Sequence, residues 1–229
     1  MKYWTWLEIK DKVQRDLDLE GETFINETEL LGYANEAVDE VERQIHTLYE
    51  DYFLTRSTIT LANGTDTYDL PSDIYAMKIR SVMYRRNSDV YKISRMRDWR
   101  KIEEYEVSKS GTHSSVRYGW FILNSTAGTP QIVFTPTPTE SGTYIQLWYL
   151  RNANEIINDA SILDIPEAAN YVMQYIKTRC YEKESHPMVQ KAVMDLQMEK
   201  DTTMATLAGM APDNENEIEA DLSVYNEMS

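Results

Sequence analysis

At 229 residues the chain is long enough to bury a substantial core, and its 42% hydrophobic and 27% charged residues exclude wholesale disorder. Its single cysteine, Cys180, excludes an intramolecular disulfide framework, and no apolar run approaches the roughly 20 residues that a membrane helix needs. The first residues lack the apolar stretch of a signal peptide, so we expect a soluble, unsecreted protein.

The net charge of −15 argues against wrapping of nucleic acid by the whole surface, but the charge is unevenly distributed. Between Lys78 and Lys101, nine basic residues stand against only Asp89 and Asp98, a net charge of +7 that leaves −22 for the rest. This polarity favours association between copies, basic face to acidic face. A solvated basic sheet face balanced by neighbouring acids is an equally good interpretation.

The N-terminal part of the chain predicts two amphipathic helices. The first covers residues 4–17, where apolar residues recur mostly at spacings of four. Asn26 is expected to cap the second helix, with Glu29 completing a capping box. Behind this cap, apolar residues at spacings of three and four form one buried stripe. They are Leu31, Ala34, Val38, Val41, Ile45 and Leu48.

The middle of the chain predicts an antiparallel β module. Alternating or β-branched stretches are separated by turn-forming residues such as Asn63-Gly64, a spacing typical of a small sandwich or barrel. Residues 98–107 fit a short helix within this module. The expected strands are 57–61, 76–84, 90–96, 116–123, 131–134 and 144–150.

Helices return after Leu163, with Asp164 as the expected cap and Pro166 in the first turn. A break at 185–187 separates two helices, and the second is expected to end at Gly209. Several methionines near the last helix suit either a core or an adaptable interface, and both interpretations remain open. They are Met188, Met194, Met198, Met204 and Met210.

The fold class predicted from these elements is α+β. We expect a helical bundle formed by the N- and C-terminal helices, with an inserted antiparallel β-sandwich or barrel module. The last segment carries six acidic residues and no basic residue, and we do not expect it to fold alone. The expected boundaries are 1–55 for the N-terminal helices, 56–151 for the β module, 152–210 for the C-terminal helices and 211–229 for an extended acidic arm.

No arrangement of residues in the sequence predicts catalysis. The three histidines lie in different segments, one cysteine cannot supply a multi-thiolate site, and the glycines stand singly. Glu36, Glu40 and Glu42 are expected on the exposed side of the second helix. We therefore predict no enzyme, no cofactor and no metal, although an enzyme with a deep pocket stays a third hypothesis.

Four motifs follow one another along the chain, and their succession carries a resemblance. They are Leu30–Val38 on the second helix, Thr67–Asp73 after the first strand, Phe134–Pro138 before the last strand and Leu163–Glu167 at the start of the C-terminal helices. This order resembles the head-to-tail adaptors of podoviruses, also called tail tubular protein A or head-completion connectors. The likeness covers roughly residues 1–210.

The resemblance implies a structural virion protein at the head-tail junction, assembled in the host cytoplasm. It implies a dodecameric ring that joins the portal protein to the tail nozzle protein and has no membrane partner. Double-stranded DNA would pass through this ring without specific binding, and the acidic composition suits such a channel.

The resemblance also implies that the acidic arm docks against the portal, and the arm carries four spaced apolar side chains that suit a partner groove. These anchors are Ile218, Leu222, Val224 and Tyr225. The basic strands would form either subunit contacts or a local phosphate contact, and we favour the former. The expected interface residues are Arg85, Arg86, Arg95 and Arg97. The alternative function is a carbohydrate- or receptor-binding β module of a phage tail or baseplate, which predicts exposed Trp and Tyr on a sheet face.

Overall fold

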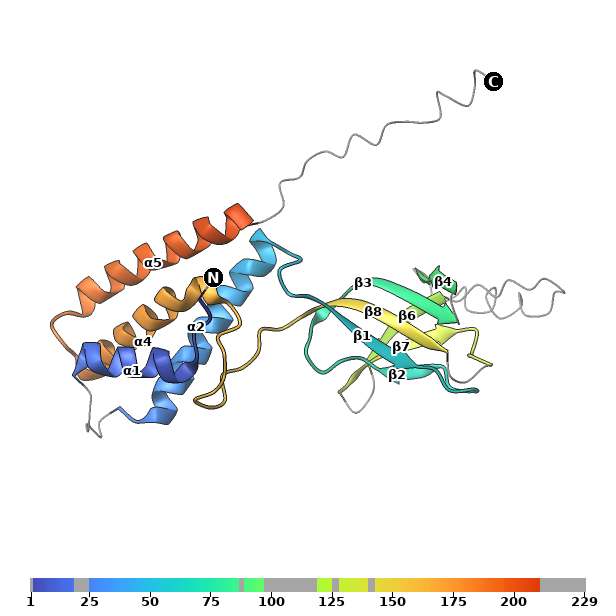
Figure 1. Cartoon of the computed structure of the whole chain (residues 1–229), viewed down its shortest axis with the longest axis horizontal. Helices are drawn as coiled ribbons and strands as arrows, with labels where there is room; N and C mark the ends of the chain where they lie inside the picture. The colour runs from blue at the N-terminus through green and yellow to red at the C-terminus, as the bar shows by residue number, and fades with distance from the viewer. Residues whose placement is uncertain are drawn as a thin grey trace, which may run out of the picture. The chain divides into compact units, whose positions relative to one another are not determined.

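The computed structural model describes residues 2–18, 25–86, 89–96, 119–124, 128–139 and 143–210. The chain divides into two compact units. Phe53–Asn152 forms a β unit, and the segments before and after it together form a helical unit. Figure 1 shows the elements of both units coloured along the chain. None of the described helices is long and apolar enough to cross a membrane.

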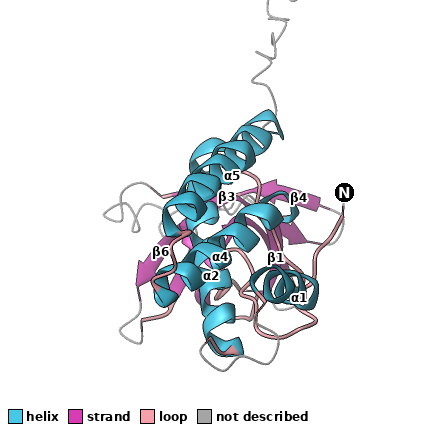
Figure 2. Cartoon of the chain, turned by 90° about the vertical axis from the view of Figure 1, so that its left-hand side faces the viewer, coloured by secondary structure: helices cyan, strands magenta, loops and turns pink. Residues whose placement is uncertain are grey.

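The helical unit brings together both ends of the described chain. Its elements are α1 (Trp6–Leu17), α2 (Glu27–Leu48), the 3-10 helix η3 (Pro166–Ala168), α4 (Ala169–Glu184) and α5 (Val189–Met210). α4 contacts α1, α2 and α5, and Figure 2 shows these helices grouped together. The side chains that α4 buries include Tyr171, Val172, Met173, Ile176 and Cys180.

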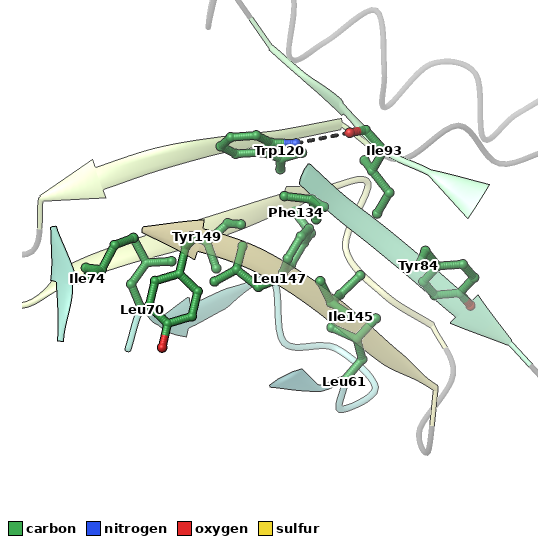
Figure 3. Packing of buried hydrophobic residues seen from close by; sticks show 12 residues of the cluster. Leu61, Leu70, Ile74, Tyr84, Ile93, Trp120, Phe134, Ile145, Leu147 and Tyr149 are labelled. Carbon is green, nitrogen blue, oxygen red and sulfur yellow. Dashed lines mark hydrogen bonds between the residues drawn. The ribbon is translucent and has the colours of Figure 1, made fainter. Parts of the chain in front are cut away.

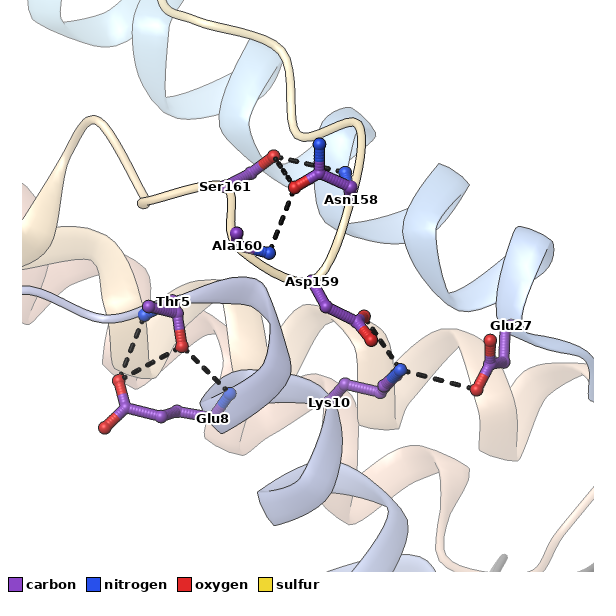
Figure 4. Close-up of polar contacts among 8 residues, drawn as sticks. All are labelled: Thr5, Glu8, Lys10, Glu27, Asn158, Asp159, Ala160 and Ser161. Carbon is purple, nitrogen blue, oxygen red and sulfur yellow. Dashed lines mark hydrogen bonds and ion pairs between the residues drawn. The ribbon is translucent and has the colours of Figure 1, made fainter.

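Capping boxes fix the start of both N-terminal helices. The backbone N–H of Glu8 donates to Thr5 Oγ1 at 3.3 Å, and the N–H of Thr5 donates to Glu8 Oε2 at 3.0 Å (Figure 4). At α2 the N–H of Glu29 donates to Asn26 Oδ1 at 2.9 Å, and the reciprocal bond is 3.1 Å. The box at Asn26 confirms the prediction from sequence, since each box satisfies two helix-end N–H groups that otherwise lack partners.

Three sequence predictions about the helical unit are wrong. Asp164 does not cap a helix, because its Oδ2 accepts the N–H of Asn154 at 2.9 Å. Glu42 is buried, not exposed, and its Oε1 accepts the N–H of Ala153 at 2.9 Å. Leu48 is 41% exposed because it lies in the last turn of α2, beyond the covered part of the stripe.

The described strands of the β unit form two four-stranded sheets. One sheet has the order β1-β8-β3-β4 and the other has the order β2-β7-β6-β5, with antiparallel pairing except between β5 and β6. The bounds are β1 Leu54–Thr60, β2 Thr67–Asp69, β3 Ile74–Arg86, β4 Asp89–Lys92, β5 Ser94–Arg95, β6 Gly119–Asn124, β7 Pro130–Thr135 and β8 Tyr144–Arg151.

Buried side chains from both sheets form one core (Figure 3). Leu147 of β8 and Ile132 of β7 are fully buried, and the Trp120 Nε1–H donates to the Ile93 carbonyl at 3.1 Å. The hydroxyl of Tyr149 donates to Asp73 Oδ1 at 2.9 Å, and burial together with this carboxylate raises the pKa of Tyr149 to about 12. Two sheets around one core, with helices at both ends, confirm the predicted α+β class.

The single strand expected at 90–96 is two strands in different sheets. β4 pairs with β3, whereas β5 pairs with β6. Ile93 lies between them, with its side chain buried in the core and its N–H donated to the Val82 carbonyl at 2.8 Å. The sequence predicted extended backbone correctly but not the change of sheet. Ile93 and Met96 are both buried, although residues three apart point to opposite faces of a single strand, and the break after Lys92 makes this possible. The helix expected at 98–107 lies outside the described residues.

Candidate assembly surfaces

One face of α5 is held against the bundle by polar and apolar contacts. The Lys200 Nζ donates to Glu40 Oε1 at 2.6 Å, which joins α5 to α2. Tyr171 of α4 is 1% exposed, and burial together with a hydrogen bond from its hydroxyl to Glu40 raises its pKa. Leu207 is fully buried on the same side of α5. Because these contacts fix the orientation of α5 in the bundle, they determine which of its side chains are exposed to solvent.

The opposite face of α5 carries large apolar side chains that the helical unit does not cover. Met194 and Met198 are 73% and 61% exposed on this face, and Val193, at the edge of the packed face, is 44% exposed. Met188 and Met210 at the two ends are also exposed. These methionines therefore do not fill the core of the chain, and flexible thioether side chains of this kind suit a protein interface.

The outer face of the β1-β8-β3-β4 sheet is a second candidate surface. Cross-strand register places its outward side chains in three rows. The rows are Arg56–Trp148–Ser81, then Thr58–Gln146–Met83–Lys92, then Thr60–Tyr144–Arg85–Val90. The Arg56 guanidinium lies 5.7 Å from the centre of the Trp148 ring. This face presents arginine, lysine and aromatic groups, and none of the side chains in these rows is a carboxylate.

The structure separates the two expected interface arginines that it describes. Arg85 lies on the outer sheet face, where Nη2 and Nε donate to Gln146 Oε1 at 3.1 and 3.3 Å. Arg95 is on β5 of the other sheet, with its guanidinium 5.6 Å from the centre of the Trp120 ring. The side chain of Arg86 and all of Arg97 lie outside the described residues. The same holds for the arm residues Ile218, Leu222, Val224 and Tyr225.

The tryptophans on the described strands do not form an exposed aromatic platform. Trp120 is 5% exposed within the core. Trp148 is partly buried beneath Arg56. Tyr91 on β4 is 55% exposed, but it packs with Tyr84, whose ring centre is 6.4 Å away. The aromatic side chains of these strands therefore mostly contribute to packing.

Sequence reasoning did not identify a polar cluster that joins three segments of the helical unit. The Lys10 Nζ donates to Asp159 Oδ1 at 2.9 Å and to Glu27 Oε1 at 3.3 Å (Figure 4). The hydrogen bond to Asp159 raises the pKa of Lys10, although burial opposes this effect. No local pattern signals this cluster, because its residues are far apart in the sequence.

Metal binding and nucleophilic chemistry each require particular side chains in a suitable setting. Across these ranges, no three His, Cys, Asp or Glu side chains come together in a way that could hold a metal ion. Cys180 is buried, and burial raises the pKa of its thiol to about 12. This thiol is therefore protonated at neutral pH.

A comparison with known protein families identifies the family of this chain. The sequence model of the family described as SU10 adaptor protein matches residues 4–218, which is nearly the whole chain. The chain belongs to this family. SU10 adaptor proteins are a phage head-tail adaptor family, so the match confirms the resemblance found from sequence. No curated protein matches the chain.

Membership in the SU10 adaptor family indicates a structural role in the phage virion at the head-tail junction. The family implies virion partners such as the portal and the tail. For an adaptor, the relevant features of the structure are its surfaces. The exposed face of α5 and the outer sheet face are two such surfaces among the described residues.

Proposed function

We propose that this protein forms a dodecameric ring that joins the portal to the tail nozzle and lines the passage for DNA, without catalysis. The family match over residues 4–218 is the observation that carries the proposal. An adaptor at a portal must contact neighbouring copies of itself as well as two different partners, and such contacts require extended uncovered surface.

The charge distribution supports contacts between copies. Phe53–Asn152 contains 13 basic and 9 acidic residues, so the β unit carries +4 and the rest of the chain carries −19. Complementary charges on two units of one chain favour a heterologous arrangement, in which the β unit of one copy faces the helical unit of the next. We propose Arg85, Arg86, Arg95 and Arg97 as contributors to this contact.

The exposed apolar face of α5 provides a second contribution to assembly. Met194 and Met198 present most of their surface to solvent in the single chain. Burying large apolar side chains between subunits stabilises an interface by about 25 cal/mol per Å² of apolar surface. We propose that this face is covered in the ring, and that the acidic arm then docks against the portal.

Electron microscopy of the protein mixed with portal particles tests this function. We expect rings of adaptor at the tail-facing end of the portal, and a Met194→Lys, Met198→Lys variant that folds but gives few rings. Gln190→Lys, Thr206→Lys is the matched control, because it adds the same two charges at exposed polar positions of α5. Portal particles that stay bare at equimolar and excess adaptor would contradict the proposal.

A further inference from the structure

Strand β1 forms a long edge of its sheet. The order β1-β8-β3-β4 places β1 outermost, and its seven residues pair with β8 without any shift of register. The other edge strands described, β4, β2 and β5, have four, three and two residues. β1 is therefore the longest template for an added strand among the edges that the structure describes.

The alternation of hydrogen bonds along β1 shows which of its backbone N–H and C=O groups point away from β8. The Phe53 carbonyl accepts from the Arg151 N–H at 3.2 Å, and the Leu61 N–H donates to the Thr143 carbonyl at 2.9 Å. Since antiparallel pairs alternate, odd-numbered residues bond to β8, and the backbone groups of even-numbered residues point outward. Those residues are Leu54, Arg56, Thr58 and Thr60, and all four side chains are exposed.

This edge lacks the features that usually prevent strand addition. β1 contains no proline and no bulge, and Arg56 is its only charged residue. Within the described part of the chain, no backbone hydrogen bond reaches the outward groups of its four even-numbered residues. Unpaired N–H and C=O groups in a row favour pairing with an extended polypeptide.

The sequence of the acidic arm has the pattern of a strand that fits this edge. In residues 217–224, Glu-Ile-Glu-Ala-Asp-Leu-Ser-Val, polar and apolar side chains alternate without exception. A strand with this pattern has one acidic face and one apolar face. Its eight residues match the seven of β1.

The two faces of such a strand match the two faces of the sheet. The outer face carries Arg56, Lys92 and Arg85, and none of its described outward side chains on β1, β8, β3 and β4 is a carboxylate. On the inner side, Ile59 and Tyr68 pack against the core of the sandwich. A strand added beside β1 would therefore direct its acids toward the basic face and its apolar residues toward the core.

We propose that residues 217–224 of one copy pair as an extended strand with the β1 edge of a second copy. The inference rests on the proposed function, because it names one contact between copies of the adaptor. Pairing occupies Ile218, Leu222 and Val224, which are also the proposed portal anchors. Pairing with β1 and docking to the portal are thus alternative states of the arm, and the portal displaces it from the neighbouring copy.

Amide hydrogen exchange gives the most direct test. A synthetic peptide covering residues 214–226 is added to the isotope-labelled full-length protein at low concentration. We expect exchange to slow about tenfold or more at the even-numbered amides of β1, with little change at the odd-numbered ones, which are already bonded to β8. A peptide of the same composition with the alternation scrambled is the control. Unchanged exchange at Arg56, Thr58 and Thr60 under saturating peptide would overturn the proposal.

A proline at the centre of the edge gives a second test. Thr58→Pro removes an outward N–H while leaving the bonds to β8, whereas Thr58→Val keeps the N–H. In sedimentation of the full-length protein over a concentration series, we expect Thr58→Pro to weaken self-association about tenfold and Thr58→Val to leave it unchanged. Equal association of the two folded variants would refute strand pairing. If Thr58→Pro does not fold, the exchange experiment decides.

Portal docking is measured separately, so that the two proposals can fail independently. Loss of portal docking on deletion of 211–229, without any peptide effect at β1, would leave the adaptor function standing and remove the strand pairing. Peptide protection at β1 with portal docking unaffected by the deletion would support the pairing and remove the portal role of the arm.

Discussion

The ion pairs of Lys10 can be removed either by replacing the lysine or by replacing its two carboxylate partners. We expect these two changes to lower the stability of the protein by different amounts. The Lys10 side chain is 7% exposed, whereas the side chains of its partners Asp159 and Glu27 are 56% and 74% exposed. Lys10→Met removes the cation and leaves two carboxylates that water can solvate. The combination Glu27→Gln with Asp159→Asn removes the anions and leaves an enclosed ammonium group.

The magnitudes follow from this difference in exposure. Lys10→Met should cost about 1 kcal/mol of unfolding free energy, since exposed ion pairs contribute little and the aliphatic stem is conserved. The double variant should cost about 3 kcal/mol, because a buried charge without its partner is poorly compensated. Since the folded-state pKa of Lys10 is raised, the stabilisation by the native pairs is present below the ordinary lysine pKa and is lost as pH rises through the raised value.

Urea denaturation at pH 7, followed by circular dichroism at 222 nm, measures both costs. We expect the midpoint of the helical transition to fall at least twice as far in the double variant as in Lys10→Met. Lys12→Met is the matched control, because it removes a neighbouring charge without disturbing the Lys10 contacts. An equal or larger loss in Lys10→Met would refute the argument that the enclosed ammonium dominates.

Three further predictions concern single groups. Asn26→Ala should cost about 1 kcal/mol in the same urea assay, because it removes the side-chain acceptor for the Glu29 N–H, and Asn26→Ser should recover most of this loss. Cys180 should react with a thiol reagent only after unfolding, since its thiol is buried with a pKa of about 12, and rapid labelling of the native protein would contradict this. Because the pKa of Tyr149 is raised to about 12, its contribution is present below the ordinary tyrosine value near 10 and lost as pH rises toward 12. The unfolding free energy of the wild type should therefore fall more steeply over that interval than that of Tyr149→Phe.

The fold could be predicted from sequence where local chemistry decides the outcome. Asn26 and Glu29 form the expected capping box because both partners lie within one turn of the same helix. Alternation predicted the strands for the same reason, since it records which face of a strand is buried. Asp164 and Glu42 were assigned wrongly because each accepts an N–H from the segment that follows the β unit, which no local pattern reveals.

The candidate surfaces were less predictable than the fold. The methionines of α5 fit a core and an interface equally well in sequence, and only the packing of α5 on α2 and α4 shows which ones are uncovered. Arg85 and Arg95 are close in sequence, but a change of sheet at Ile93 places them in different sheets. Surfaces of this kind depend on tertiary arrangement, and periodicity alone does not specify it.

The hydrogen bond between Phe53 and Arg151 has an evolutionary consequence. It places the entry and the exit of the β unit side by side, within about 5.5 Å for paired strand residues. The β unit can therefore be inserted, deleted or exchanged as a whole, because a short loop is enough to reconnect the two parts of the helical unit. Phages that share the helical scaffold could in this way acquire different modules for different tails.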